Sequence, residues 1–489
     1  MNKKELPNTS RPVYNRHSKK WAIPERVSCV QTIAKLIEPR TQIDESKKRF
    51  NNRTLLALIV PIIIEQFLVL LVGIADSLMV SYAGEEAVSG VSLVDQLNNV
   101  FIRVFTALAA GGAVVASQYI GSRDEKNGSK AASQLILITS LLGAVSALVV
   151  LVFGRQIFGA LFGSVEPGVL DAGLLYLRLS AWSYLFLAVY NACAGLYRSM
   201  GKTRELMYVS LMMNAINVIG NAIGIFALHA GVRGVAIPSL IARAFAAVVM
   251  LKLVFGKQNP IRVTVRNIFA RDASMVRRIL RIALPNGIED GLFQLAKVAL
   301  SSIVALFGTV QIAAYGVAQN FWAMGALFPV AMGPAFITVI GQYMGARDID
   351  GANYYMEKLL RFTYVGGVVW SLGFTVISPL ILLVYSLGEE TRQLIILLII
   401  LHNLFNALLA PCAFPLSSGL RAAGDVKFTM FAAIFSTVVC RVVFSVLFGI
   451  VLDMGVVGVT IAMIIDWCVK AVLIFRRYRS KKWTEFQVI

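Results

Sequence analysis

Charged residues are scarce in this sequence, and so are cysteine and histidine. Asp, Glu, Lys and Arg together account for 15% of the 489 residues, whereas hydrophobic residues account for 57%. A typical soluble domain is about one quarter charged, so this composition excludes an ordinary cytosolic enzyme and a disordered chain. The five cysteines are scattered and form no CxxC pair, which excludes a disulfide scaffold and is typical of small buried side chains.

Sequence signatures of catalysis and of nucleotide use are missing as well. The three histidines lie far apart in the sequence and show no metal-ligand spacing. The Walker A pattern GxxxxGKS/T does not occur, so ATP is not expected to be the energy source. No catalytic triad emerges from the sequence. We therefore expect neither an enzyme nor a resident cofactor.

Long apolar runs, by contrast, are abundant. From Arg53 onward they alternate with short polar breaks. A helix needs about 20 apolar residues to span a bilayer, and lipid offers no partner to an unpaired backbone group. We therefore predict an all-α membrane protein with twelve transmembrane helices at about 54–81, 92–118, 131–153, 172–198, 206–228, 232–255, 279–307, 314–343, 359–385, 392–420, 427–450 and 455–476.

The basic residues are distributed unevenly along the chain. Residues 1–50 are polar and basic and contain no apolar segment of the signal-peptide type. With the N-terminus inside, most of the 46 Lys and Arg residues fall in inner segments, and the outer loops hold only Arg155, Arg233 and Arg392. The positive-inside rule then predicts two cytoplasmic termini in a plasma or inner membrane. The net charge of +19 belongs to the inner membrane surface, and no nucleic-acid partner is needed to explain it.

The chain also contains an internal repeat with a constant displacement of 224 residues. Residues 118–124 (QYIGSRD) pair with 342–348 (QYMGARD), and further blocks at 61–65, 195–196 and 231–235 share this register. Each half holds six predicted helices, so both halves have the same sidedness, and such parallel repeats suit alternating access in secondary transporters. We divide the chain into an N-terminal extension (1–52), a first lobe (53–256), a linker (257–278), a second lobe (279–476) and a basic tail (477–489).

Polar side chains within the first half suggest an ion site. Asp76 lies late in the first predicted helix, where a carboxylate is costly and needs a partner or a function. Asn214, Asn217 and Asn221 are spaced by three and four residues and so share one helix face. Such oxygen ligands suit Na+, and a carboxylate in a dry pocket can instead titrate near neutral pH. Alternatively, the asparagines only join helices through hydrogen bonds.

Together these features resemble the multidrug and toxic compound extrusion (MATE) transporters over about residues 53–476. The resemblance rests on Pro61 followed by Asp76, the GxRD turns at 121–124 and 345–348, GLRAAGD at 419–425 and the paired GVxGV turns. It implies a V of two pseudo-symmetric six-helix bundles that exports bulky, often cationic or amphipathic compounds in exchange for Na+ or H+. It also implies a cation-binding or coupling site made of Asp76, Asn217, Asn221 and Ser239.

The chain departs from many prokaryotic members of that family at Asn221, where they carry Asp. One carboxylate fewer weakens both a proton relay and the charge compensation of a bound cation. The sequence therefore leaves the coupling ion and the stoichiometry open. Ser239 stands where relatives often have Thr, which keeps the hydroxyl group.

A candidate second polar site lies in the second half. Glu289 and Asp290 are neighbours there, and Glu65 is the repeat mate of Glu289. Two interpretations stay open: the carboxylates couple ions or attract a cationic substrate, or each glutamate pairs with a Lys or Arg near the cleft. Lys297 and Arg103 are the candidate counter-charges.

Aromatic and polar side chains supply possible substrate contacts. Aromatic faces attract organic cations, and we single out Trp322, Met324, His402 and Asn406. Most such residues in a membrane bundle pack against neighbours or face lipid. For His402 a hydrogen-bonded contact between helices is the simpler interpretation.

We therefore predict a monomeric antiporter whose partners are small-molecule substrates, a coupling cation and the bilayer. One alternative is a flippase-type transporter of lipid-linked precursors, which favours a strongly basic central cavity. The predicted spans contain few basic residues, which counts against that alternative. A second alternative, a non-transporting membrane receptor or assembly factor, is disfavoured by the repeat and by the carboxylates within the spans.

Overall fold

The computed structural model describes residues 36–39, 43, 44, 48–162, 166–270, 272–383, 385 and 387–489. Most of the predicted N-terminal extension lies outside the described residues. The described part contains twelve helices that are long and apolar enough to cross a membrane. This confirms the predicted all-α fold with twelve spans.

The first half of the chain forms six long helices. Asn51 begins the series, because its side chain accepts a hydrogen bond from the Thr54 backbone N–H at 2.7 Å and caps the first helix. The helices are α2 (Asn52–Ser81), α3 (Glu85–Ser122), α4 (Glu125–Phe162), α5 (Pro167–Ser199), α6 (Thr203–Ala222), which continues as the π-helix η2 (Ile223–Ala227), and α7 (Arg233–Val254).

The second half repeats this order with more interruptions. A short α8 (Val265–Phe269) lies in the predicted linker. There follow α9 (Ala273–Val304) with η3 (Ala305–Phe307), α10 (Thr309–Gly325), α11 (Leu327–Gly345), α12 (Ile349–Leu382), α13 (Glu389–Ala413), α14 (Pro415–Ala423), α15 (Val426–Ile434), the π-helix η4 (Phe435–Val442), α16 (Val443–Ser445), the π-helix η5 (Val446–Val451), α17 (Gly455–Arg479) and η6 (Lys482–Glu485).

Several helices differ from the predicted spans. The span predicted at 92–118 is a helix from Glu85 to Ser122, because polar residues extend it beyond the apolar run. The span predicted at 314–343 consists of two helices, α10 and α11, which meet at Ala326. Hydropathy marks the part of a helix that lies in lipid, whereas hydrogen bonding decides where the helix ends.

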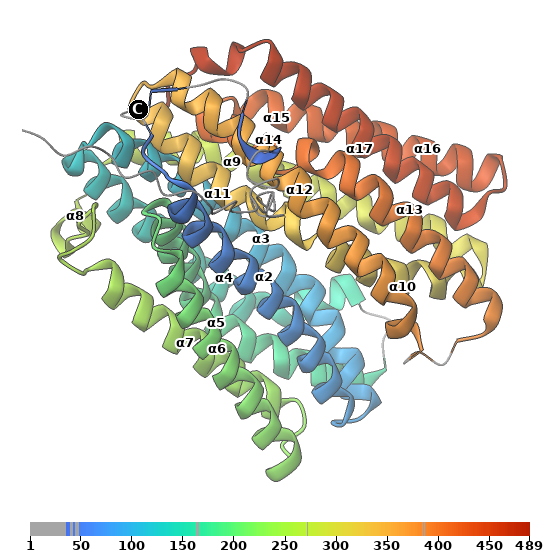
Figure 1. Cartoon of the computed structure of the whole chain (residues 1–489). Coiled ribbons are helices and arrows are strands. Elements are labelled where there is room, and N and C mark those ends of the chain that lie inside the picture. Colours follow the sequence, from blue (N-terminus) through green and yellow to red (C-terminus); the bar gives the residue numbers. More distant parts are fainter. Residues whose placement is uncertain are drawn as a thin grey trace, which may run out of the picture.

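The helices assemble into two bundles, as predicted. Figure 1 shows α2 to α7, in blue to green, as one group, and α9 to α17, in yellow to red, as another. We call these the first and the second bundle. They meet where α3 packs against α9 and α11 and where α2 packs against α11.

The tightest contact between the bundles is made by the repeated GxRD turns. A Cβ atom added at Gly121 would overlap the backbone carbonyl of Gln342, and one added at Gly345 would overlap the backbone carbonyl of Gln118. The two Gln side chains also cross between the bundles: Gln118 donates to the Ala422 carbonyl at 2.7 Å, and Gln342 donates to the Ser199 carbonyl at 2.9 Å. One end of the molecule is therefore closed by a contact that obeys the symmetry of the repeat.

The remaining residues of these turns shape the chain. Arg123 and Arg347 have φ of 59° and 58°, a left-handed conformation that ends α3 and α11. Asp124 then accepts a hydrogen bond from the Asn127 backbone N–H at 3.0 Å, and Asp348 accepts one from the Gly351 N–H at 2.9 Å. The bond from the Asn127 N–H holds the pKa of Asp124 below its ordinary value. In each copy of the motif the Arg thus ends one helix, and the Asp that follows it caps the start of the next.

Residues just before α2 also join the two bundles at this closed end. The Arg49 guanidinium donates to the Gly121 carbonyl at 3.1 Å, while its backbone N–H donates to the Tyr343 hydroxyl at 2.7 Å. Phe50 is buried against the rings of Tyr343 and Tyr355. The end of the N-terminal extension is therefore part of the packed structure.

Candidate functional site

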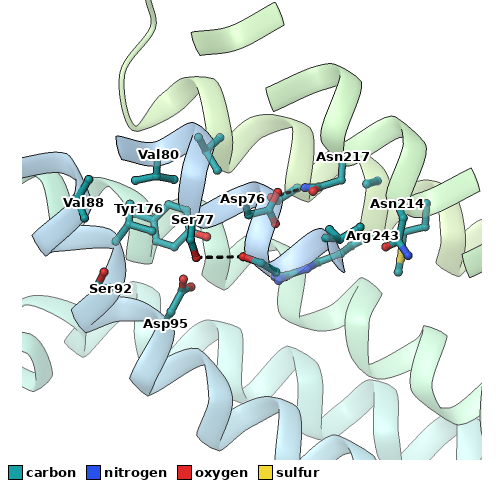
Figure 2. A pocket seen from close by; sticks show the side chains of 17 residues that line it. Asp76, Ser77, Val80, Val88, Ser92, Asp95, Tyr176, Asn214, Asn217 and Arg243 are labelled. Atoms are coloured by element: carbon teal, nitrogen blue, oxygen red, sulfur yellow. Dashed lines mark hydrogen bonds between the residues drawn. The ribbon is translucent and has the colours of Figure 1, made fainter. Parts of the chain in front are cut away.

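The first bundle encloses a polar cavity of about 260 Å3. Asp76 reaches it from α2, Asn217 from α6 and Ser239 from α7. Figure 2 shows the side chains of Asp76 and Asn217 side by side at this cavity. Three of the four residues predicted for the cation site thus line one cavity although they come from three helices.

Hydrogen bonds connect all four predicted residues. Asn221 donates to Asp76 Oδ1 at 2.7 Å. The amide orientation of Asn217 that matches donors to acceptors places its nitrogen 2.9 and 3.2 Å from the two Asp76 oxygens. In this orientation the Asn217 oxygen accepts from the Ser239 hydroxyl at 2.8 Å. Two amide donors therefore hold one carboxylate in a fixed position.

One oxygen beside this carboxylate is left over. Asn221 Oδ1 is buried and has no hydrogen-bond partner within the described part of the chain. The Asn214 amide nitrogen, one helical turn before Asn217, is also buried without a partner there. A buried oxygen without a donor is a favourable ligand for a small cation, because the cation restores the interaction that burial removed.

Three residues of this cavity were missed by the sequence analysis as site residues. Asp95 and Tyr176 line it, and Arg243 reaches it from α7 while donating to the Ser183 hydroxyl at 2.6 Å. Asp95 lies inside the predicted 92–118 span, so a count of every carboxylate within a span would have found it. The cavity therefore holds two carboxylates, Asp76 and Asp95, against one guanidinium.

A second cavity of about 530 Å3 lies between the two bundles. Residues of α2 and α3 form one side, and residues of α9, α10, α11, α14, α15, η4 and α17 form the rest. Of the candidate second polar site, Glu289 and Asp290 line this cavity, whereas Glu65 does not. Glu65 is instead buried in the first bundle, with 3% of its surface exposed.

Both glutamates form ion pairs. This agrees with the interpretation in which Glu65 and Glu289 each pair with a Lys or Arg. Glu65 Oε1 lies 2.7 Å from an Arg198 nitrogen. Glu289 Oε1 lies 2.9 Å from an Arg421 nitrogen and 3.1 Å from Lys470 Nζ. The predicted counter-charges Lys297 and Arg103 were wrong for these glutamates, because sequence spacing along one helix cannot show which side chains of other helices approach it.

Four basic residues of the predicted spans, together with Arg421 from a predicted inner loop, line the larger cavity, whereas Arg178 and Arg243 do not. Five basic side chains line it against three acidic ones: Arg103, Lys297, Arg421, Arg441 and Lys470 against Glu289, Asp290 and Asp466. The count of basic residues within the spans thus did not show that five basic side chains would line one cavity. The residues are few, but folding concentrates them in one place.

The candidate substrate contacts fall into two groups. Trp322 lines the larger cavity and stacks on Trp467, with 5.7 Å between ring centres. His402, Asn406 and Met324 are not among the residues that line it in the described structure. His402 is buried and neither ring nitrogen has a hydrogen-bond partner in the described part of the chain, so the expected hydrogen-bonded contact between helices was wrong. Asn406 is buried and donates to the Gly325 carbonyl at 3.1 Å, so its amide joins α13 to α10.

The Glu65–Arg198 pair gives a direct prediction for stability. Glu65→Gln is expected to lower the free energy of unfolding by about 3–5 kcal/mol, because it leaves a largely buried guanidinium without its counter-charge. Thermal and denaturant unfolding of the purified protein in detergent measures this change. Glu389→Gln is the matched control, since it breaks a more exposed pair with Arg392 and is expected to cost about 0–1 kcal/mol. Equal losses of unfolding free energy in the two variants would contradict the conclusion that the buried Glu65–Arg198 pair stabilises the fold.

The comparison with known protein families agrees with the repeat. The family model MatE matches residues 61–223 and again residues 285–447. The matched segments begin 224 residues apart, which is the displacement found in the sequence. The chain belongs to the MatE family. This confirms the resemblance to MATE transporters, and it identifies the chain as a multi-pass membrane transporter of a multidrug efflux family.

Individual relatives of this MATE protein are distant but cover nearly the whole chain. It is similar to the "Uncharacterized transporter YisQ" of Bacillus subtilis, at 28% identity over 88% of this chain and 95% of YisQ. It is also similar to the "Probable multidrug resistance protein NorM" of Thermotoga maritima, at 22% identity over 92% of this chain and 96% of NorM.

Solved structures show the same fold. An outward-facing multidrug resistance MATE transporter of the MOP superfamily superposes with a TM-score of 0.82 at 21% sequence identity. The match covers 88% of this chain and 95% of that one. At this level of identity the likeness concerns the arrangement of helices and not the ligands.

Proposed function

We propose that this MATE protein is a secondary antiporter that exports organic, often cationic or amphipathic, compounds in exchange for Na+ or H+. It acts as a monomer in the plasma or inner membrane, with both termini in the cytoplasm. The observation that carries the proposal is the geometry around Asp76: two amides hold the carboxylate in a cavity, and the buried Asn221 Oδ1 lacks a partner in the described structure.

This geometry favours a bound cation for a simple electrostatic reason. Asp76 and Asp95 place two carboxylates at a cavity that holds one guanidinium, Arg243. A Na+ ion or a proton compensates the unbalanced charge, and Na+ also takes oxygen ligands from neutral amides. The absence of a carboxylate at position 221 leaves both ions open.

Coupling follows from the position of the carboxylate. Asp76 lies on α2, and the same helix contributes Gln66, Val69 and Leu70 to the larger cavity. A shift of α2 on cation binding therefore changes the wall of the cavity that holds the substrate. Linkage requires the effect to be reciprocal, so that each ligand disfavours the bound state of the other.

The proposal is tested by collapsing the two ion gradients separately. Efflux of a fluorescent drug from cells that express the protein is measured with the sodium gradient or the proton gradient dissipated. We expect export to stop when the coupling gradient is removed and to continue when only the other one is removed. Export that continues with both gradients collapsed would contradict the antiport mechanism.

A second candidate function is favoured by one observation. The five basic side chains at the cavity between the bundles suit the phosphate groups of lipid-linked precursors, as in flippase-type transporters. Uptake of a labelled lipid by proteoliposomes, compared with uptake of a drug, separates the two functions. Transport of the lipid without transport of any drug would favour the flippase.

A further inference from the structure

The cavity between the two bundles has an electrostatic character that the antiport mechanism does not use. Its volume of about 530 Å3 suits a drug-sized molecule, since ligand pockets in proteins range from about 300 to 1,000 Å3. Of the charged side chains that line it, the basic ones outnumber the acidic ones by five to three. The excess sign is therefore positive.

The ion pairs within the cavity leave an excess of positive charge at one place on its wall. Glu289 is shared by two cations, Arg421 and Lys470, and Asp466 is taken by Arg441 at 2.8 Å. The paired charges therefore leave surplus positive charge beside Glu289.

A second group of cations lies beside these pairs. Lys297 and Arg103 form no ion pair within 4.0 Å in the described structure, and Lys297 lies within electrostatic range of both Arg103 and Arg441. Asp290 also lacks a close partner there and acts on Arg103 from a distance. Lys297 thus has two guanidinium groups in range and no ion-pair partner of its own in the described structure.

Unused hydrogen-bond donors point to the same kind of ligand. Arg441 Nε, Arg421 Nε and Trp322 Nε1 are buried and have no acceptor within the described part of the chain. The Arg441 side chain is only 4% exposed. One acceptor, Glu289 Oε2, also lacks a hydrogen bond there, but the same carboxylate already pairs with two cations. Buried donors that lack acceptors favour a ligand that brings anionic oxygens.

The remaining wall of the cavity is mostly apolar and includes four aromatic side chains. Phe293, Phe414, Trp322 and Trp467 line it, and Arg441 lies over the Phe293 ring at 5.4 Å. Such a wall binds a flat or hydrophobic body rather than a free inorganic anion. The ligand is therefore expected to be amphipathic.

The repeat shows that this character is specific to the second bundle. Arg441 is the repeat mate of Asn217, because the two positions are 224 residues apart. In the first bundle the neutral Asn217 lies against Asp76 and leaves the carboxylate in excess. In the second bundle a guanidinium occupies the same position. Equivalent places in the two bundles thus have opposite electrostatic preferences.

We propose that the cavity between the bundles binds its substrate through an acidic group, a carboxylate, sulfonate or phosphate attached to an apolar or aromatic body. Lys297 and Arg441 are the residues that recognise this group. The inference rests on the proposed export function, and among the organic and amphipathic compounds named there it selects acidic or zwitterionic ones in place of cations. In this proposal the coupling ion binds at the Asp76 cavity of the first bundle, and the substrate binds between the bundles.

Equilibrium binding to the protein in nanodiscs tests this proposal with two dyes that share a ring system. Fluorescein carries a carboxylate, whereas rhodamine 6G is a cation with the carboxyl group esterified. We expect fluorescein to bind about tenfold more tightly, because charge-assisted hydrogen bonds to one anionic group supply about that factor. Tighter binding of rhodamine 6G would overturn the proposal.

Variants identify the residue responsible. Lys297→Gln is expected to weaken fluorescein binding about tenfold and to leave rhodamine 6G binding unchanged or improved. Lys297 forms no ion pair in the described structure, so folding does not depend on it through a salt bridge. Lys252→Gln is the matched control, since Lys252 is exposed at the end of α7 and lines neither cavity. Equal fluorescein affinity in the Lys297 variant and wild type would overturn the role of Lys297.

Competition distinguishes the sources of the acidic group. Displacement of fluorescein by dihexanoyl phosphatidylglycerol, but not by dihexanoyl phosphatidylcholine, identifies an anionic lipid. Displacement by aromatic carboxylates alone identifies soluble organic acids. Because these measurements need no ion gradient, a failure to prefer anions overturns this inference and leaves the antiport proposal intact. Tighter binding of the anionic dye without gradient-driven export would support this inference and contradict the antiport proposal.

Discussion

Replacing Asp76 by Asn is expected to reduce gradient-driven drug export by at least about tenfold. The substitution keeps the shape of the side chain but removes both the negative charge and the proton-binding group. Asn221 and Asn217 then face a neutral amide instead of a carboxylate, and neither Na+ nor a proton is held there. The measurement is the initial rate of efflux in cells that express equal amounts of variant and wild type.

Two controls show whether the effect belongs to this carboxylate. Ser81→Ala removes a hydroxyl of the same helix that donates to the Leu78 carbonyl at 2.7 Å and lines neither cavity, and it is expected to leave efflux near the wild-type rate. Asp95→Asn removes the other carboxylate of the cavity and is expected to have a smaller effect, because no asparagine of α6 holds Asp95 in the described structure. Full efflux by the Asp76 variant would refute the ion-coupling role of this site.

The second large effect is expected at the contact between the GxRD turns. Gly121→Ala places a methyl group on the backbone carbonyl of Gln342. A carbonyl within a helix cannot rotate away, so α3 and α11 must separate at the closed end. We expect a loss of about 3 kcal/mol or more in the free energy of unfolding, at or above the upper end of ordinary overpacking costs.

The control for this substitution lies on α12. A Cβ added at Gly373 meets no atom within 4 Å, so Gly373→Ala is expected to be neutral or slightly stabilising, as an alanine in an open helix position usually is. Thermal unfolding of both variants in detergent measures the difference. Gly345→Ala is expected to repeat the effect of Gly121→Ala, because the repeat places it against the Gln118 carbonyl. A Gly121 variant as stable as the Gly373 variant would show that the crossing is looser than the structure indicates.

Part of the candidate site could be predicted from the sequence because the residues are unusual for their surroundings. Asp76 is an acidic residue in an apolar run, and Asn217 and Asn221 share a helix face by spacing alone. The structure brings both asparagine amides within 2.7 to 3.2 Å of the Asp76 carboxylate. Asp95 has the same signature and was passed over as a site residue, which shows that the signal was present in the sequence. The site roles of these residues stay predictions until efflux is measured.

The second cavity could not be predicted in this way. Its charged residues come from α3, α9, α14, η4 and α17, and spacing along one helix carries no information about the rotation of another. Arg421 was counted as part of an inner loop, yet it belongs to α14 and pairs with Glu289. His402 and Asn406 lie on the same helix, and the sequence does not show which face of that helix packs against neighbours and which lines a cavity. Both side chains are buried. The predicted division into domains likewise stays a prediction.

The sequence by itself determined that the chain is helical, spans a membrane twelve times and is built from two copies of one unit. These properties depend on composition, on the length of apolar runs and on a repeat register, all of which are local or periodic. Only the tertiary structure decided which charges meet: Glu65 with Arg198, Glu289 with Arg421 and Lys470, and a positive excess between the bundles. The physical reason is that electrostatic energy depends on distances between side chains of different helices, and packing alone sets those distances.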